Sequence, residues 1–341
     1  MSNQSPNLDL LRSTAVLLVF FCHAPYLFGL GGVLHVEFGF FGVMLFFVHT
    51  SVVLSASLAR LEQRDGPVVF SFYVRRAFRI YPLSMLTVLT VFILHIPPWF
   101  KTPYRGPDPQ YFWSNLLLYQ NLARQWAVLA PLWSLPYEVQ MYLVLPMFYF
   151  WGKRFRHPVV LGASGLLVYM ADWLVSKRLG TPMLFPYAPF FTLGIALYFT
   201  KAKQMFSGTA YCVFLGLTVA AISVCHNSLA DNYWIVLLFG LGFRWLREIE
   251  SRWLCAAAHF VAKYSYGIYL SHIPIMWLVT EPMSAAPVVL RIAVFLILAP
   301  AVPILLYYTV EKPAIDLGTR LTCRLRYQPA ANRMATGESL Q

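Results

Sequence analysis

The chain contains few charged residues. Only 12% of its 341 residues are Asp, Glu, Lys or Arg, whereas 59% are hydrophobic. A soluble domain usually has about 25% charged residues, so this composition excludes an ordinary water-soluble protein. It is typical of an integral membrane protein with several spanning segments.

Acidic residues are scarcer than basic ones, 14 against 26, which leaves a net charge of +12. The basic residues lie between apolar runs instead of on one polar segment. The preference of Lys and Arg for cytoplasmic loops explains this distribution. We therefore expect membrane lipids as partners and no nucleic acid.

Cysteine is also rare. The five cysteines are scattered, with no Cys-x-x-Cys pair and no spacing typical of metal ligands. This pattern excludes a disulfide framework and a zinc site. We expect no bound metal.

Apolar runs of bilayer-spanning length recur along the whole chain, with no polar domain between them. They predict an all-α, polytopic integral membrane protein of about ten transmembrane helices, with both termini cytoplasmic. This arrangement places most Lys and Arg residues on the inner side. The predicted spans are 10–28, 39–58, 78–96, 132–151, 158–176, 183–200, 208–226, 233–249, 264–281 and 288–309.

Two segments are expected to lie outside these spans. Residues 111–130 form an apolar run that several polar residues interrupt, which predicts a re-entrant or interfacial segment. The polar residues 327–341 predict a disordered cytoplasmic tail. The rest of the chain, 1–326, is expected to form a single transmembrane domain.

The first apolar run contains Arg12 and, eleven residues later, His23. Eleven helical residues make about three turns, so both side chains project from nearly the same face, about 16 Å apart along the axis. An ionisable residue so deep in a bilayer is costly and indicates a functional site. The alternative is a buried histidine that hydrogen-bonds a neighbouring helix.

Glu138 lies in the fourth run, about 9 Å below the outer interface and at a depth comparable to that of His23. A carboxylate and an imidazole at one depth can form an acid–base pair inside a cavity. The alternative is a structural tie from Glu138 to an arginine or histidine of another helix.

Three arginines, Arg75, Arg76 and Arg79, lie at the inner end of the third span. Their spacings of three and four residues predict a cluster on one helix face. Guanidinium groups bind phosphate and other oxyanions bidentately, so the cluster suits an anionic ligand. The alternative is a charge cluster that sets membrane orientation and contacts lipid headgroups.

Further polar residues lie inside the predicted spans. Tyr264, Tyr269 and His272 of the ninth run either line the same cavity or hydrogen-bond between helices. We expect His49 in the second span and Asp172 in the fifth to be structural.

The segment Gly162-Ala-Ser-Gly165 matches the Gly-x-Ser-Gly of rhomboid-type intramembrane proteases. No suitably placed histidine motif follows it. Small residues in a membrane helix commonly form a packing face, which is the interpretation that we favour.

Five of these stretches, taken in order, resemble the acyltransferase-3 family of bacterial integral-membrane acyltransferases. The matches extend from residue 8 to about residue 313. Arg12 to His23 resembles the family's Arg-x10-His motif, and Gly42 to Val48 its second-helix GVxLFFV motif. The other three are Phe72 to Pro82 (RRxxRIxP), Trp133 to Pro146 (WSLxxE…YLxxP) and Tyr264 to His272 (SYxxYLxH).

The chain departs from the family pattern at several positions. Met44 stands where the family commonly has Asp, and Thr50-Ser51-Val52 replaces a usual Ser-Gly-Phe. His49 stands where an apolar residue is usual, and Val139 where a second Glu often follows the first. Because of these departures, we expect the acceptor pocket to differ from the one that the family pattern implies.

The resemblance implies a multi-pass enzyme of the bacterial inner membrane. It would transfer an acyl group from cytoplasmic acyl-CoA, with acetyl-CoA as the expected form, to a hydroxyl of a carbohydrate, a glycolipid or another envelope acceptor. Acyl-CoA is a co-substrate here, and no permanently bound cofactor is implied.

The resemblance also implies roles for individual residues. His23 would be the general base or acyl-handling residue, Arg12 would support the thioester or its phosphates, and Glu138 would act at the acceptor side. The implied substrate- and donor-binding residues are Arg75, Arg76, Arg79, Trp133, Ser134, Tyr269 and His272.

Two other classes of function stay open on the sequence. A transporter or flippase would move a lipid-linked sugar through the same cavity without acyl chemistry. A binding or scaffold protein would use the intramembrane polar residues only as ties between helices.

Overall fold

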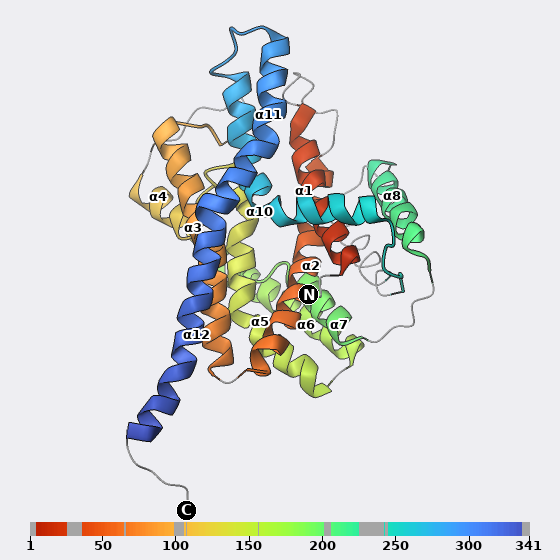
Figure 1. Ribbon diagram of the computed structural model, residues 1–341, viewed down its shortest axis with the longest axis vertical. Helices are drawn as coiled ribbons and strands as arrows, with labels where there is room; N and C mark the ends of the chain where they lie inside the picture. Colours follow the sequence, from red (N-terminus) through yellow and green to blue (C-terminus); the bar gives the residue numbers. More distant parts are fainter. Residues whose placement is uncertain are drawn as a thin grey trace, which may run out of the picture.

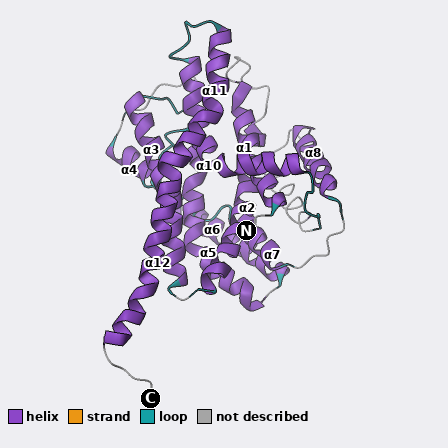
Figure 2. Cartoon of the chain, in the orientation of Figure 1, coloured by secondary structure: helices purple, strands orange, loops and turns teal. Residues whose placement is uncertain are grey.

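The structure, a computed structural model, describes residues 5–25, 36–64, 66–98, 106, 108–155, 157–200, 206–224, 242 and 245–335. Within these ranges the chain is helical and has no strand, as Figure 2 shows. One isolated bridge joins Phe206 and Leu246. The predicted all-α class is therefore confirmed for this part of the chain.

The helices form one assembly from which the last helix projects (Figure 1). In chain order they are α1 (Pro6–His23), α2 (Val36–Glu62), α3 (Val68–Leu94), α4 (Pro109–Leu116), η2 (Ala130–Ser134), α5 (Leu135–Phe155), α6 (Pro158–Leu179), α7 (Ala188–Phe199), α8 (Gly208–Val224), α10 (Arg252–Thr280), α11 (Val288–Leu306), the π-helical turn η3 (Tyr307–Glu311) and α12 (Lys312–Ala335).

Helix α1 packs against both α2 and α10, and these three helices frame the site described below. An ideal Cβ placed on Gly42 of α2 would lie 2.6 Å from the carbonyl oxygen of Ala15 in α1. Only glycine therefore allows α1 and α2 to approach this closely. On its other side α2 packs on α7, where Gly194 lies directly against Val48 and Ser51.

Within the described residues, four helical segments are long and apolar enough to cross a membrane: Glu37–Glu62, Val68–Leu94, Val159–Leu179 and Val288–Cys323. They overlap the second, third, fifth and tenth predicted spans. The chain is thus helical with apolar segments of spanning length, as expected for a membrane protein. The number of about ten spans and the cytoplasmic termini stay predictions.

Several predicted boundaries differ from the structure. Helix α7 has 12 residues, because Pro186 and Pro189 delay its start to Ala188, well after the predicted residue 183. Helix α10 begins at Arg252 instead of 264, since Ser251 caps its first turn by accepting a hydrogen bond from the Leu254 N–H.

Two predictions concern segments near the ends of described ranges. The eighth span, 233–249, lies mostly outside the described residues, and its last residues, 247–249, are not helical. Helix α12 continues to Ala335, so the expected disordered tail is helical up to that residue. Gln328, Arg333 and Met334 are residue types that favour helices, which agrees with a helix that continues past residue 327, and residues 336–341 lie outside the described residues.

The interrupted apolar run at 111–130 contains no spanning helix, as predicted. It holds the short helix α4 and a series of turns that lead to η2. Buried Asn115 organises these turns: its amide donates to the Trp126 carbonyl at 3.1 Å and accepts from the Val128 N–H at 2.8 Å. The polar residues that interrupt the run thus satisfy backbone groups that a helix would otherwise pair.

A candidate active site around Arg12

Three adjoining cavities share Arg12 in their walls. The largest, which we call the vestibule, has a volume of about 380 Å³ and begins near the N-terminal end of α1, at Ser5. The second, the junction, shares Arg12, His49, Val53 and Arg79 with the vestibule. The third, the chamber, shares Arg12, Thr50, Glu138 and Tyr266 with the junction and reaches Ser134 and Tyr269.

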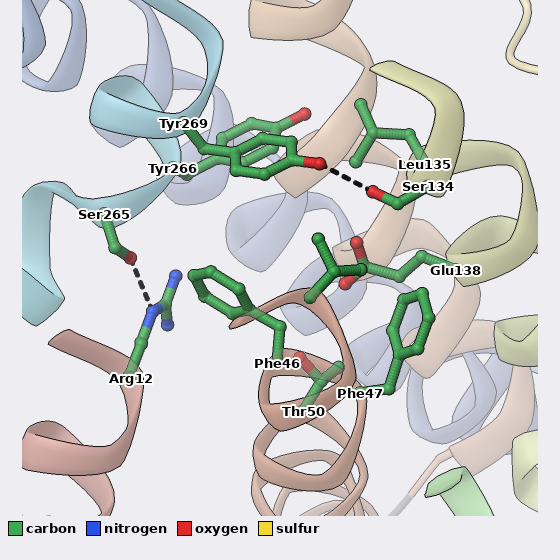
Figure 3. A pocket seen from close by; sticks show the side chains of 11 residues that line it. Arg12, Phe46, Phe47, Thr50, Ser134, Leu135, Glu138, Ser265, Tyr266 and Tyr269 are labelled. Carbon is green, nitrogen blue, oxygen red and sulfur yellow. Dashed lines mark hydrogen bonds between the residues drawn. The ribbon is translucent and has the colours of Figure 1, made fainter. Parts of the chain in front are cut away.

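Arg12 is held by α10. Its Nε donates a hydrogen bond of 2.6 Å to the Ser265 hydroxyl, which itself donates to the Ala262 carbonyl at 2.8 Å. Figure 3 shows the guanidinium of Arg12 pointing into the chamber, with Glu138 on the opposite wall. Among the described residues no carboxylate forms an ion pair with Arg12, so its charge faces a cavity that Glu138 also lines.

Glu138 accepts a hydrogen bond from the Tyr142 hydroxyl, one turn further along α5. Both residues line the junction together with Arg76 and Arg79. The predicted acid–base pair of Glu138 with His23 is wrong in its geometry, because no hydrogen bond joins the two described side chains. The prediction from the sequence considered only the depth of the two residues in the bilayer. It did not consider which helices separate them.

His23 instead contacts His272 of α10. The Nε2 of His272 lies 3.3 Å from the Nδ1 of His23, and the ring centroids are 5.2 Å apart. Both Nδ1 atoms face carbonyl oxygens, Val19 for His23 at 2.8 Å and Ile268 for His272 at 3.1 Å. Since a carbonyl only accepts, each Nδ1 carries a proton, and Nε2 of neutral His23 carries the lone pair.

Ser134 and Tyr269 close the far end of the chamber. The Tyr269 hydroxyl donates to the Pro131 carbonyl at 2.5 Å and lies 2.8 Å from the Ser134 hydroxyl. A hydroxyl has one proton, so Ser134 is the donor in the second bond. The Tyr269 ring lies 6.3 Å from that of His272, which links the chamber to the two histidines.

Trp133 lies outside all three cavities. Its ring stacks on Phe40 of α2, with centroids 5.7 Å apart and an interplanar angle of 6°, and meets the ring of Tyr187 edge-on. Trp133, a predicted binding residue, therefore packs η2 against α2 and against the chain before α7.

The three arginines of α3 do not face one ligand together. Arg76 and Arg79 line the junction, whereas Arg75 donates from Nε to the Thr322 hydroxyl of α12 at 3.0 Å. Arg75 points about 100° away from Arg76 around the helix and lines none of the three cavities. The buried Nε of Arg76 has no hydrogen-bond partner in the described part of the chain, which favours a ligand or water in the junction.

Two residues of the candidate site were either not predicted from the sequence or expected to be only structural. Glu311 in the π-helical turn η3 forms an ion pair of 2.6 Å with Arg79, and its side chain is fully buried. His49, expected to be structural, is 4% exposed and lines both the vestibule and the junction. The available signals were an isolated acidic residue after a long apolar run and a histidine where the family has an apolar residue.

Other polar residues are structural. Asp172 accepts hydrogen bonds from the N–H groups of Leu184 and Phe185, as expected for a loop-stabilising residue. In the Gly162–Gly165 segment, Gly165 packs directly on Thr192 of α7 and Ser164 bonds the carbonyl of its own helix. This contact confirms a packing face. Within the described ranges, no group of three His, Cys, Asp or Glu side chains is placed to hold a metal ion.

Over most of its length the chain is similar to proteins of a known family. The family described as "Acyltransferase domain" (Acyl_transf_3) matches residues 5–308, a range that contains all the residues around Arg12 described above except Glu311 and Thr322. No solved structure matches the chain.

Two curated relatives are similar over most of this chain. One, "Putative peptidoglycan O-acetyltransferase YrhL" of Bacillus subtilis (strain 168), is 26% identical over 92% of this chain. The chain spans only 55% of that relative's length. The other, "Nodulation protein 10" of Rhizobium leguminosarum bv. viciae, is 24% identical over 95% of this chain and 96% of its own length. The chain therefore belongs to the acyltransferase-3 family.

Proposed function

We propose that the protein transfers an acyl group from acyl-CoA to a hydroxyl of a carbohydrate or glycolipid of the cell envelope. The expected acyl group is acetyl. The observation that supports this most is the series of cavities through Arg12. A cationic vestibule suits the phosphates of the donor, and the narrower junction and chamber suit its extended thioester arm.

Three groups supply the chemistry in this proposal. Nε2 of His23 takes the proton from the acceptor hydroxyl as its oxygen attacks the thioester carbonyl carbon. Arg12 stabilises negative charge on the donor, and His272 and the Val19 carbonyl hold the His23 ring through Nδ1, so that Nε2 is the basic nitrogen. The carbon–sulfur bond then breaks, and the leaving CoA thiolate takes the proton from His23, which regenerates the neutral imidazole.

Glu138 has a different role in this scheme. It lies across the chamber from Arg12 and accepts from Tyr142, and in this proposal it orients polar groups of the substrate. As a second candidate base it has one advantage over His23, because Glu138 lines the chamber directly, whereas His23 lines none of the three cavities and contacts His272.

The membrane arrangement is also part of the proposal. About ten spans with both termini cytoplasmic would place the N-terminal end of α1, and with it the vestibule, on the side where acyl-CoA is available. A bacterial inner membrane is the matching location. The carbohydrate acceptor is supported by the name of the Bacillus relative, and no comparison supports the transporter alternative.

The experiment uses the purified full chain in nanodiscs, [14C]acetyl-CoA and a panel of peptidoglycan fragments and lipid-linked sugars. We expect CoA thiol release that requires an acceptor and that falls about 10²–10⁴-fold in His23→Ala. His157→Ala, at an exposed histidine before α6, is the matched control. Acceptor uptake into vesicles without thiol release would contradict the proposal. A larger loss in Glu138→Gln than in His23→Ala would make Glu138 the base.

A further inference from the structure

The vestibule contains two groups of cations. Arg12 and Arg79 lie where it adjoins the junction, whereas Arg60, His259 and Lys263 line the vestibule alone. Arg60 belongs to the last turn of α2 and is exposed, and His259 and Lys263 lie one turn apart on α10. A donor that fills the vestibule would therefore meet positive charge at two separate places.

The group that lines the vestibule alone, Arg60, His259 and Lys263, is the outer group, and the protein does not neutralise it. In the described part of the chain neither Arg60 nor Lys263 forms an ion pair. Asp9, the carboxylate among the residues that line the vestibule, is engaged by His259, whose Nδ1 lies 2.8 Å from an Asp9 oxygen. The positive charge of Arg60 and Lys263 is thus available to a bound anion.

Lys263 is held in place instead of moving freely. Its ammonium donates to the Tyr308 hydroxyl at 3.1 Å and lies 5.0–5.2 Å from the ring centroids of Tyr264, Tyr307 and Tyr308. These contacts reduce the entropy that the side chain loses when it binds a ligand. The π-helical turn η3 provides two of the three tyrosines, which fits the frequent use of π-helical turns at functional sites.

A buried polar side chain also faces this cavity. His49 is buried and lines the inner part of the vestibule beside Arg12. Its imidazole therefore offers a polar ring to a ligand in that part of the cavity. A volume of about 380 Å³ is within the range of small-molecule sites.

We propose that Arg60 and Lys263 bind a phosphomonoester of the acyl donor, distinct from the phosphates that reach Arg12 and Arg79. The inference rests on the proposed function, because acyl-CoA carries a diphosphate next to its thioester arm and a separate 3′-phosphate on its ribose. The outer pair then selects donors that carry the 3′-phosphate and makes no contact with the reacting carbonyl.

The test compares acetyl-CoA with 3′-dephospho-acetyl-CoA in wild type and in Arg60→Gln/Lys263→Gln. We expect wild type to prefer acetyl-CoA in KM by tenfold or more. In the double variant KM for acetyl-CoA rises at least tenfold, KM for the dephospho donor stays within twofold and kcat is unchanged. Arg64→Gln, an exposed arginine that lines none of the cavities, should behave as wild type. Equal preference in wild type and double variant would overturn the inference.

A binding measurement separates this inference from the proposed function. Calorimetry with adenosine 3′,5′-bisphosphate and adenosine 5′-phosphate needs no turnover. We expect the bisphosphate to bind tenfold or more tightly to wild type, and the double variant to lose that difference. If the bisphosphate shows this preference for wild type while acetyl-CoA is not consumed, the phosphate site is supported and the proposed reaction is contradicted. If acetyl-CoA is consumed and both nucleotides bind alike, the reaction stands and the phosphate site falls.

Discussion

The Nε2 of His272 lies 3.3 Å from the Nδ1 of His23, across the contact between α10 and α1. The two residues are 249 positions apart in the chain, yet each ring is oriented by the other and by a carbonyl of its own helix. A base whose ring is fixed by a second group is a recurring arrangement in enzymes that activate hydroxyls.

Replacing His272 by alanine should lower kcat about tenfold and leave KM for the donor unchanged, because His272 positions His23 without lining the cavities. The pH dependence of kcat should also shift, since His23 loses the neighbour that accepts from its Nδ1. Steady-state kinetics across pH 5.5–9 measure both effects. A variant with the wild-type pH profile and kcat would show that the contact is only packing.

Glu311→Gln should destabilise the protein by about 3 kcal/mol, because it leaves the Arg79 guanidinium without its buried counter-charge. The double variant Arg79→Met/Glu311→Leu should recover part of that loss, since neither charge remains. Thermal unfolding in detergent gives the stabilities, and donor binding should be weakened in both variants. Equal melting temperatures for Glu311→Gln and wild type would contradict an energetically significant ion pair.

Gly42→Ala should destabilise the fold by about 1–3 kcal/mol, because the added methyl collides with the Ala15 carbonyl and pushes α1 from α2. Gly162→Ala is the matched control. Nothing lies within 4 Å of its Cβ position, so alanine there should stabilise α6 by about 0.5–1 kcal/mol. The same thermal assay measures both, and a similar change in the two variants would refute the packing argument.

Tyr269→Phe should lower stability by about 1–2 kcal/mol, because it removes the bond to the Pro131 carbonyl and the acceptor of the Ser134 hydroxyl. Ser134→Ala removes only the second bond and should cost less. If the hydroxyl also positions the substrate near His272, kcat falls more in Tyr269→Phe than in Ser134→Ala. Kinetics and thermal unfolding of the two single variants separate these contributions.

Much of the fold followed from local patterns. Apolar runs predicted helices, and the described part of the chain is helical. The run at 111–130 was correctly excluded as a span because Asn115 and its polar neighbours interrupt it. Boundaries were less accurate where prolines or a capping serine set them, as at Ala188 and Ser251.

For the site, the sequence predicted the residues that the proposed chemistry uses. Arg12 and His23 are eleven positions apart, and helix geometry alone places them on one face; both indeed contact α10. The motif residues Glu138, Ser134 and Tyr269 likewise surround the chamber.

Only the tertiary structure decided which of these side chains meet. It paired His23 with His272 and Glu138 with Tyr142, turned Arg75 toward α12, and brought Glu311 to Arg79. The physical reason is that periodicity along a helix fixes the direction of a side chain on that helix. Which helix lies opposite depends on close packing, such as the contact of Gly42 with Ala15, and that information is distributed over the whole chain.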